Sequence, residues 1–323
     1  MRNLLVDLNR YFSKYKYVIG FIVLVVILFL LVTRQYDKMG RKVGDSRNTT
    51  ISESVSNEIS VNQVSNNTDI TKVEDVSKYI KTEKDMINAF YMLCNDNKLD
   101  LAYEMLTDDC KQVLYPNLED FKNNYYNVIF KTNKDIEIIS FKNNTYRVNF
   151  NEEAITMGNA GSKGLTDYVT VTKDNKINIS GFIRKEQINV NTTKQYFSAQ
   201  ITEKQVFVDY EVLSFSIKNN IKADIYINDA SGSGLYITDS NGKAYYVDSG
   251  EYNDYDYYIP AETQKSLTIR FKKQYDDSTT TASINFNNIK IENKKYYEKN
   301  NNQQIEKMTS YPDKISDSIN LKN

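Results

Sequence analysis

The chain has 323 residues, with 41 Lys and Arg against 42 Asp and Glu, and its formal net charge is −1. A nucleic-acid-binding domain usually carries a basic excess, so no nucleic-acid partner is expected. The chain contains no His, which excludes Ser-His-Asp and Cys-His catalysis and every His-containing metal site. No cofactor is expected. The 26 Tyr, the many Asn and the absence of Trp are typical of an AT-rich genome, which favours a low-GC Gram-positive bacterium.

The first hydrophobic feature is an uncharged run, residues 17–33, between Lys16 and Arg34. As a helix it is about 25 Å long, and the flanking basic side chains can reach the membrane interfaces. No small-residue cleavage site follows, so we expect a transmembrane helix in the lipid bilayer rather than a signal peptide. The basic residues on its two sides nearly balance. The short head, residues 1–16, and the long remainder favour a cytoplasmic N-terminus and extracellular C-terminal domains.

Residues 34–76 are polar, have no periodicity and predict a disordered tether. A helical pattern follows, with one apolar stripe from Ile80 to Cys94. A shorter helix carries Leu99 to Leu106, and Asn117 is a candidate N-cap for a third.

After Phe130 the apolar period changes from three or four residues to two. About four antiparallel strands are expected, and their turns lie at Asn143-Asn144, at residues 156–164 and at residues 173–176. Helices followed by strands predict the fold class α+β for residues 77–184.

The segments "NDNKLDLAYEML", "TDDCKQVL" and "NLEDFKNNYYNVIF", followed by a curled sheet, resemble the nuclear-transport-factor-two-like superfamily over about residues 80–184. Similar domains occur beside the membrane in some penicillin-binding proteins and in scaffold proteins of conjugative secretion channels. The resemblance implies a cone-shaped domain. It does not imply one activity, because the fold serves both enzymes and scaffolds.

Residues 185–292 show only short strand patterns, separated by turn signals, and predict a β-sandwich. The stretches "LYITDSNGKAYYV" and "IPAETQKSLTIRF" resemble immunoglobulin-like domains of bacterial surface proteins. Residues 293–323 are expected to be a flexible tail. The predicted order is therefore a transmembrane helix, an α+β domain and an all-β domain.

Two groups of tyrosines are candidate binding residues. A concave pocket in the first domain is expected to be lined by Tyr91, Tyr103, Tyr125 and Tyr126. A protein or glycan surface on the second domain is expected at Tyr252, Tyr255, Tyr257 and Tyr258. Core packing is the alternative interpretation of both groups. Asp100 and Glu104, the acidic residues nearest the first pocket, are expected to be solvated rather than catalytic.

Other motifs have simpler explanations. The glycines of residues 158–164 do not have Walker spacing, and Ser13-Lys14-Tyr15-Lys16 is the basic flank of the predicted span. The acidic loops of the second domain, from Asp229 to Asp256, have turn composition, with calcium binding as the alternative. Cys94 and Cys110 are interpreted as small buried side chains, and a disulfide between them remains open.

The function expected from these features is that of a non-catalytic, membrane-anchored protein that binds or scaffolds a protein or cell-wall partner outside the cell. A structural subunit of a conjugation or secretion channel is the first alternative. A pocket enzyme that uses carboxylate or tyrosine chemistry is the second.

Overall fold

The structure is a computed structural model, and it describes Val76 and residues 80–151, 165–228, 232–248, 250, 252–300 and 303–321. All of them belong to one compact unit, residues 56–323. The predicted head, the predicted span with Lys16 and Arg34, and the glycine loop of residues 156–164 lie outside the described residues. So does the predicted tether, except Val76, which is buried in a core. Among the helices that are described, none is long and apolar enough to cross a membrane.

The helical region begins at α4 (Glu83–Asn95), whose N-cap Thr82 accepts a hydrogen bond from the backbone N–H of Asp85. The chain turns at Asn97, whose φ of 57° is in the left-handed region that Asn tolerates. Two short helices follow, α5 (Leu99–Glu104) and α6 (Asp108–Leu114). Helix α6 is not one of the three helices expected from the apolar periodicity. Its start is fixed by Thr107, whose hydroxyl caps the N–H of Cys110 at 3.0 Å.

The third predicted helix is present but irregular. It begins as α7 (Leu118–Phe121), widens into a π-helical turn η1 (Lys122–Tyr126), and ends as α8 (Asn127–Ile129). The predicted N-cap is confirmed, since Oδ1 of Asn117 accepts from the N–H of Asp120 at 2.9 Å. A π turn inserts one residue and rotates the next residues around the helix axis. In a regular α-helix Val128 would lie on the same face as the buried Phe121, seven residues earlier, but after the π turn it is 55% exposed.

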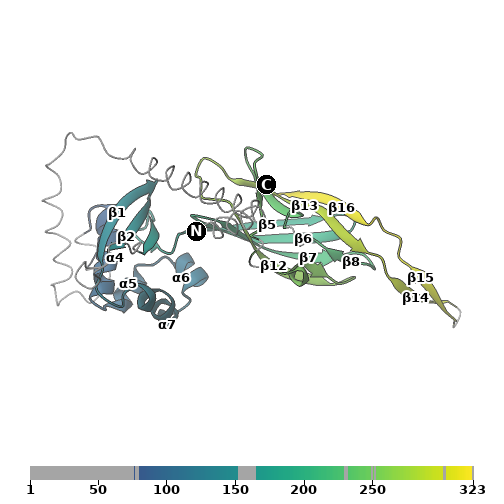
Figure 1. Ribbon diagram of the computed structural model, residues 1–323, viewed down its shortest axis with the longest axis horizontal. Helices are drawn as coiled ribbons and strands as arrows, with labels where there is room; N and C mark the ends of the chain where they lie inside the picture. The colour runs from purple at the N-terminus through teal and green to yellow at the C-terminus, as the bar shows by residue number, and fades with distance from the viewer. Residues whose placement is uncertain are drawn as a thin grey trace, which may run out of the picture. The chain divides into compact units, whose positions relative to one another are not determined.

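The first sheet lies beside these helices and has four antiparallel strands in the order β1-β2-β3-β4 (Figure 1). The strands are β1 (Asp135–Lys142), β2 (Thr145–Asn151), β3 (Thr166–Val171) and β4 (Ile177–Asn178). Helices and sheet enclose one aromatic-rich core, to which Phe90, Phe121 and Phe150 contribute.

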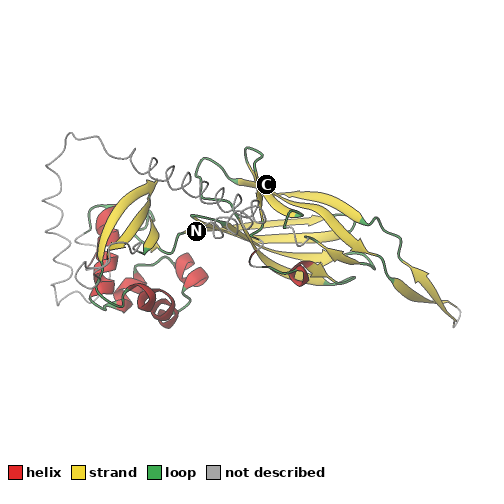
Figure 2. Cartoon of the chain, in the orientation of Figure 1, coloured by secondary structure: helices red, strands yellow, loops and turns green. Residues whose placement is uncertain are grey.

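Two further sheets enclose a second core (Figure 2). One has the order β12-β7-β6-β5 and is built from β5 (Phe182–Thr193), β6 (Phe197–Phe207), β7 (Glu211–Asn219) and β12 (Gln264–Phe271). The other has the order β10-β9-β13-β8-β11, and β16 also pairs with β13. Its strands are β8 (Asp224–Tyr226), β9 (Leu235–Asp239), β10 (Ala244–Tyr246), β11 (Tyr258–Ile259), β13 (Thr281–Glu292) and β16 (Lys314–Asn320). A 3-10 turn, η3 (Asp254–Tyr257), precedes β11.

The predicted fold class α+β is wrong. Strands make up 48% of the described part of the chain and helices 20%, so this part of the protein is mainly β. The three expected helices are present and α6 was not expected, while the strands are longer than the patterns indicated. β5 and β13 each have 12 residues, and the predicted boundary between residues 184 and 185 falls inside β5.

The C-terminal region also differs from the expected flexible tail. It forms a two-stranded ribbon from β14 (Lys295–Asn300) and β15 (Gln303–Met308), and then β16. These strands could not be predicted from apolar alternation, because their side chains are mostly polar and the ribbon is held by backbone pairing rather than by apolar burial. Its exposed apolar side chains are Tyr297, Ile305 and Met308.

Candidate functional site

A buried carboxylate lies at the centre of the first core. Asp167, on β3, is 6% exposed, and its Oδ2 atom accepts hydrogen bonds from the hydroxyls of Tyr125 at 2.7 Å and Tyr91 at 3.2 Å. Oδ1 accepts from the backbone N–H of Tyr168 at 2.6 Å, and the backbone of Ser180 also donates to the carboxylate. Four donors therefore occupy the acceptor positions of one carboxylate.

Three elements far apart in the sequence bring these groups together. Helix α4 supplies Tyr91, the π turn η1 supplies Tyr125, and β3 supplies Asp167. The Tyr125 hydroxyl also lies 3.2 Å from the Tyr91 hydroxyl, which closes a triangle of polar contacts inside an aromatic cluster. The network thus ties the helical layer to the sheet.

Burial controls the titration of this triangle. It raises the pKa of Asp167 to about 6, although the hydrogen bonds from Tyr125, Tyr168 and Tyr91 act in the opposite direction. Burial also raises the pKa of Tyr91 and of Tyr125 well above the ordinary value, and the Asp167 charge raises both further. Both phenols are therefore protonated donors at neutral pH.

A cavity of about 400 Å³ opens beside this triangle. Its buried wall contains Phe150, Phe207 and Val208, while Val128 and Leu165 are about half exposed, at 55% and 50%. The polar groups along it belong to Tyr125, Asp167, Tyr168, Ser180, Asp209 and Tyr210, together with Asn124 and Thr166. It is an aromatic and aliphatic pocket with a few polar groups, which is the usual composition of a ligand site.

The four tyrosines predicted to line a pocket have different positions. Tyr125 lines this cavity, and Tyr91 lies behind it against Asp167. Tyr103 donates from its hydroxyl to the backbone oxygen of Tyr115 at 2.8 Å, and Tyr126 stacks on Phe130. Neither of the latter two is among the residues that line the cavity.

The four tyrosines predicted to form a surface do not gather into one exposed patch. Tyr255 is 75% exposed, whereas Tyr257 is buried in the second core at 3%. Tyr258 donates to Oδ2 of Asp224 at 2.6 Å, and this hydrogen bond raises its pKa to about 12. The Tyr252 hydroxyl accepts from the N–H of Arg270 at 2.9 Å.

The acidic loops of the second domain are organised as turns. Asp239 accepts from the backbone N–H groups of Asn241 and Lys243, and Asn253 and Asp256 form a capping box at η3. No group of three or more His, Cys, Asp or Glu that could hold a metal occurs among the described residues. Cys94 and Cys110 are buried free thiols. Asp100 and Glu104 are exposed.

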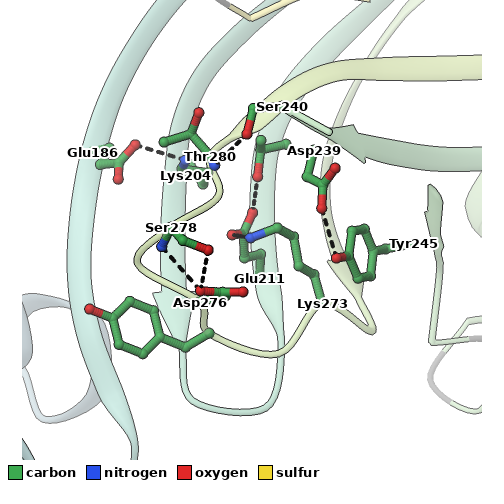
Figure 3. A network of polar contacts seen from close by, with 12 residues as sticks. Glu186, Lys204, Glu211, Asp239, Ser240, Tyr245, Lys273, Asp276, Ser278 and Thr280 are labelled. Carbon is green, nitrogen blue, oxygen red and sulfur yellow. Dashed lines mark hydrogen bonds and ion pairs between the residues drawn. The ribbon is translucent and has the colours of Figure 1, made fainter. Parts of the chain in front are cut away.

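A second buried polar network lies in the second domain (Figure 3). Nζ of Lys273 lies 2.7 Å from Oε1 of Glu211, and the two side chains are 2% and 3% exposed. The Thr281 hydroxyl donates to the other Glu211 oxygen. Asp239 accepts from the Tyr245 hydroxyl at 2.9 Å. Burial acts to raise the pKa of Asp239, but the hydrogen bonds from Tyr245 and from the backbone of Lys243 and Asn241, with a smaller effect of the Lys273 charge, lower it below its ordinary value. In this network the buried Glu211 carboxylate has a buried cation, the Lys273 ammonium group, beside it.

Sequence reasoning missed Asp167 as a site residue, although a signal for it existed. In a strand, alternate side chains point to one face. Asp167 has the same parity as Val169 and Val171, both of which are buried. An acidic residue in register with core residues indicates a buried carboxylate.

Comparison with known proteins adds little to this geometry. No protein-family model and no curated protein matches the chain. A solved structure of a conserved hypothetical protein from Bacillus anthracis matches the chain with 12% sequence identity and a TM-score of 0.24. The match covers 38% of this chain and 95% of that protein's chain. This likeness assigns neither a fold family nor a function.

Proposed function

We propose that the protein is a non-catalytic binding protein and that the cavity beside Asp167 receives the apolar body of a small ligand. The observation that carries the proposal is the cavity itself, about 400 Å³ with buried aromatic and aliphatic walls. Val128 and Leu165 expose apolar surface at its rim. Removing such surfaces from water is the main source of affinity for an apolar ligand.

The chemistry of the buried triangle supports binding rather than catalysis. A general base needs a free lone pair aimed at the substrate proton. The Asp167 carboxylate already accepts from Tyr125, Tyr91 and two backbone N–H groups. A tyrosine nucleophile or base would need a lowered pKa, but the pKa values of both phenols are raised.

The proposal is tested with methyl-labelled full-length protein and the neutral probe 4-phenyl-1-butanol. Saturable shifts of the Val128, Ile129 and Val208 methyl signals are expected, since these side chains line the cavity. Val128→Trp fills the rim and should abolish the shifts. Ile305→Trp is the matched control, because Ile305 is also exposed, at 41%, and lies on the ribbon. Absence of pocket shifts at millimolar probe would contradict the proposal.

An acid–base enzyme is a second candidate, and one observation favours it. The pKa of Asp167 is about 6, beside a cavity, which suits proton transfer near neutral pH. An enzyme requires that one tyrosine hydroxyl leave the carboxylate when substrate binds. Mass spectrometry of a bound ligand would distinguish the two functions. In an enzyme, wild type converts the ligand and Asp167→Asn binds it unchanged, whereas in a binding protein neither converts it.

Location remains a proposal from the sequence. The uncharged run of residues 17–33 supports attachment to a membrane, and the proposal places the described residues outside the cell. Proteolysis of intact cells tests this, because external protease should remove epitopes placed after residue 80. The resemblances to the nuclear-transport-factor-two-like superfamily and to immunoglobulin-like domains likewise stay predictions.

A further inference from the structure

The buried carboxylates of this protein differ in how their charge is balanced. The five buried acidic side chains among the described residues are Asp85, Asp167, Glu211, Asp224 and Asp239. Glu211 and Asp224 each form an ion pair with a lysine, Lys273 and Lys294 respectively. Asp239 lies near the charge of Lys273. Asp85 is in the first turn of α4, where the helix dipole favours a negative charge.

Asp167 has none of these compensations. Its hydrogen-bond partners are neutral, and it forms no ion pair with a Lys or Arg of the described chain. Hydrogen bonds satisfy the lone pairs of a carboxylate but leave its net charge in a poorly solvated environment. A cation placed in the adjoining cavity would balance this charge.

The composition of the cavity also favours a cationic ligand. The described residues that line it include two carboxylates, Asp167 and Asp209, and no Lys or Arg. Asp209, in the turn between β6 and β7, is exposed at the rim. The rings of Tyr125, Phe150 and Phe207 add the negative faces that attract organic cations.

Two basic groups near the cavity, Arg270 and Lys142, already interact with other parts of the protein. The Arg270 guanidinium lies 4.1 Å from the centre of the Tyr210 ring, and that ring stacks on Phe207. Lys142 donates to the backbone oxygen of Tyr275 and lines a second cavity, which Asp209 also borders. Asp209 therefore has a lysine in its vicinity, so Asp167 is the carboxylate on which recognition of a cation depends.

We infer that the cavity selects a small organic amine, with its ammonium group towards Asp167 and its apolar stem against Phe150, Phe207 and Val208. This inference rests on the proposed function, since it names the ligand class of the same cavity. It assigns Asp167 as the source of charge selectivity and the aromatic walls as the source of affinity for the stem. Selectivity and affinity can therefore be separated by experiment.

The test uses three probes with one stem and different head groups: 4-phenylbutylamine, 4-phenyl-1-butanol and 4-phenylbutyrate. They are titrated against the full-length protein at pH 7.5, where the amine is cationic and the carboxylate anionic. The amine is expected to bind at least about tenfold more tightly than the alcohol. The butyrate is expected to bind more weakly than the alcohol. This order needs no variant, so it is informative even if a substitution prevents folding.

Two variants then locate the selectivity. In Asp167→Asn, the amine and the alcohol should bind within about twofold of each other, with the affinity for the alcohol retained. In Asp209→Asn, most of the preference for the amine should remain. Equal binding of amine and alcohol to wild type, or a preserved preference in Asp167→Asn, would overturn the inference while leaving the cavity a binding site. Failure of all three probes to bind would instead overturn the proposed function.

Discussion

Lys273 and Glu211 form an ion pair that is almost completely enclosed, with Nζ and Oε1 2.7 Å apart and exposures of 2% and 3%. Lys273→Met should therefore destabilise the protein by about 3–5 kcal/mol, because it leaves the Glu211 charge buried and unpaired. Lys272→Met is the matched control. Lys272 is exposed and pairs with Asp248 at 3.1 Å, so its loss should change the free energy of unfolding by less than about 1 kcal/mol.

The double variant Lys273→Met, Glu211→Leu removes both charges and should recover most of that loss. Urea unfolding of the four proteins measures the effect. Equal free energies of unfolding for the Lys273 and Lys272 variants would show that the pair is hydrated rather than enclosed.

The stability contributed by Asp167 should depend on pH with a definite sign. Burial raises its pKa in the folded protein to about 6, above the ordinary 3.8. The folded state therefore binds this proton more tightly than the unfolded state. The resulting stabilisation is complete below about pH 4 and is lost as the pH rises through 6, by about 3 kcal/mol. Asp167→Asn cannot titrate.

Denaturant unfolding of wild type and Asp167→Asn at pH 4 and pH 7.5 measures this effect. The unfolding free energy of wild type minus that of the variant should be smaller at pH 7.5 than at pH 4. Other carboxylates contribute equally to both proteins and cancel. A constant difference would mean that Asp167 keeps an ordinary pKa in the folded protein.

The adjacent tyrosines of η1 should respond differently to loss of their hydroxyls. Tyr125→Phe removes the 2.7 Å hydrogen bond to Asp167, and we expect a loss of about 1.5–3 kcal/mol at pH 7.5. Tyr126 stacks on Phe130 through its ring, so Tyr126→Phe should be nearly neutral. Thermal unfolding of both variants compares them directly. The same change in both would place Tyr125 outside the carboxylate network.

Asn219 should be among the most sensitive polar residues of the second core. It is fully buried, and its amide donates to the backbone oxygens of Ala223, Ile259 and Pro260. Asn219→Ala leaves these acceptors without that donor, and a loss of about 2–4 kcal/mol is expected. The neighbouring Asn220 is exposed, so Asn220→Ala is the control, with an expected change within about 0.5 kcal/mol. Chemical denaturation distinguishes the two.

The two thiols should be unreactive in the folded protein. Burial raises the pKa of Cys94 well above its ordinary value and that of Cys110 to about 12, so neither forms the reactive thiolate at neutral pH. Thiol labelling should proceed only at the rate of unfolding, and both cysteines should react in urea. Rapid labelling without denaturant would show that the first core opens locally. A mass that increases on reduction would reveal a disulfide.

The strands of the second domain could be predicted because apolar and polar residues alternate between clear turn signals. The short strand patterns expected within residues 185–292 overlap observed strands. Helix α6 was missed because the second predicted helix ends at Leu106 and polar residues follow it, whereas Thr107 is the N-cap of a new helix. The π turn has no sequence pattern of its own.

The candidate site was only partly predictable for a different reason. Tyr125 could be assigned to the core from its helical spacing. Its partner Asp167 lies 42 residues away, and Tyr91 lies 76 residues from the same carboxylate. Apolar periodicity identifies the face on which a side chain lies, but it carries no information about which distant side chain lies opposite. The hydrogen-bond network around Asp167 could therefore be identified only from the tertiary structure.

Strand β5 contributes Phe182 to the first core and Val190 to the second, and its pairing with β6 is interrupted between Gln187 and Val190. At that interruption Asn189 has a φ of 54°, so the inward and outward sides of the strand are reassigned partway along it. This β-bulge interrupts the alternation of inward and outward side chains along β5. An insertion or deletion on one side of it alters the register of one core and can leave the other intact, so the two halves of a single strand are free to diverge separately.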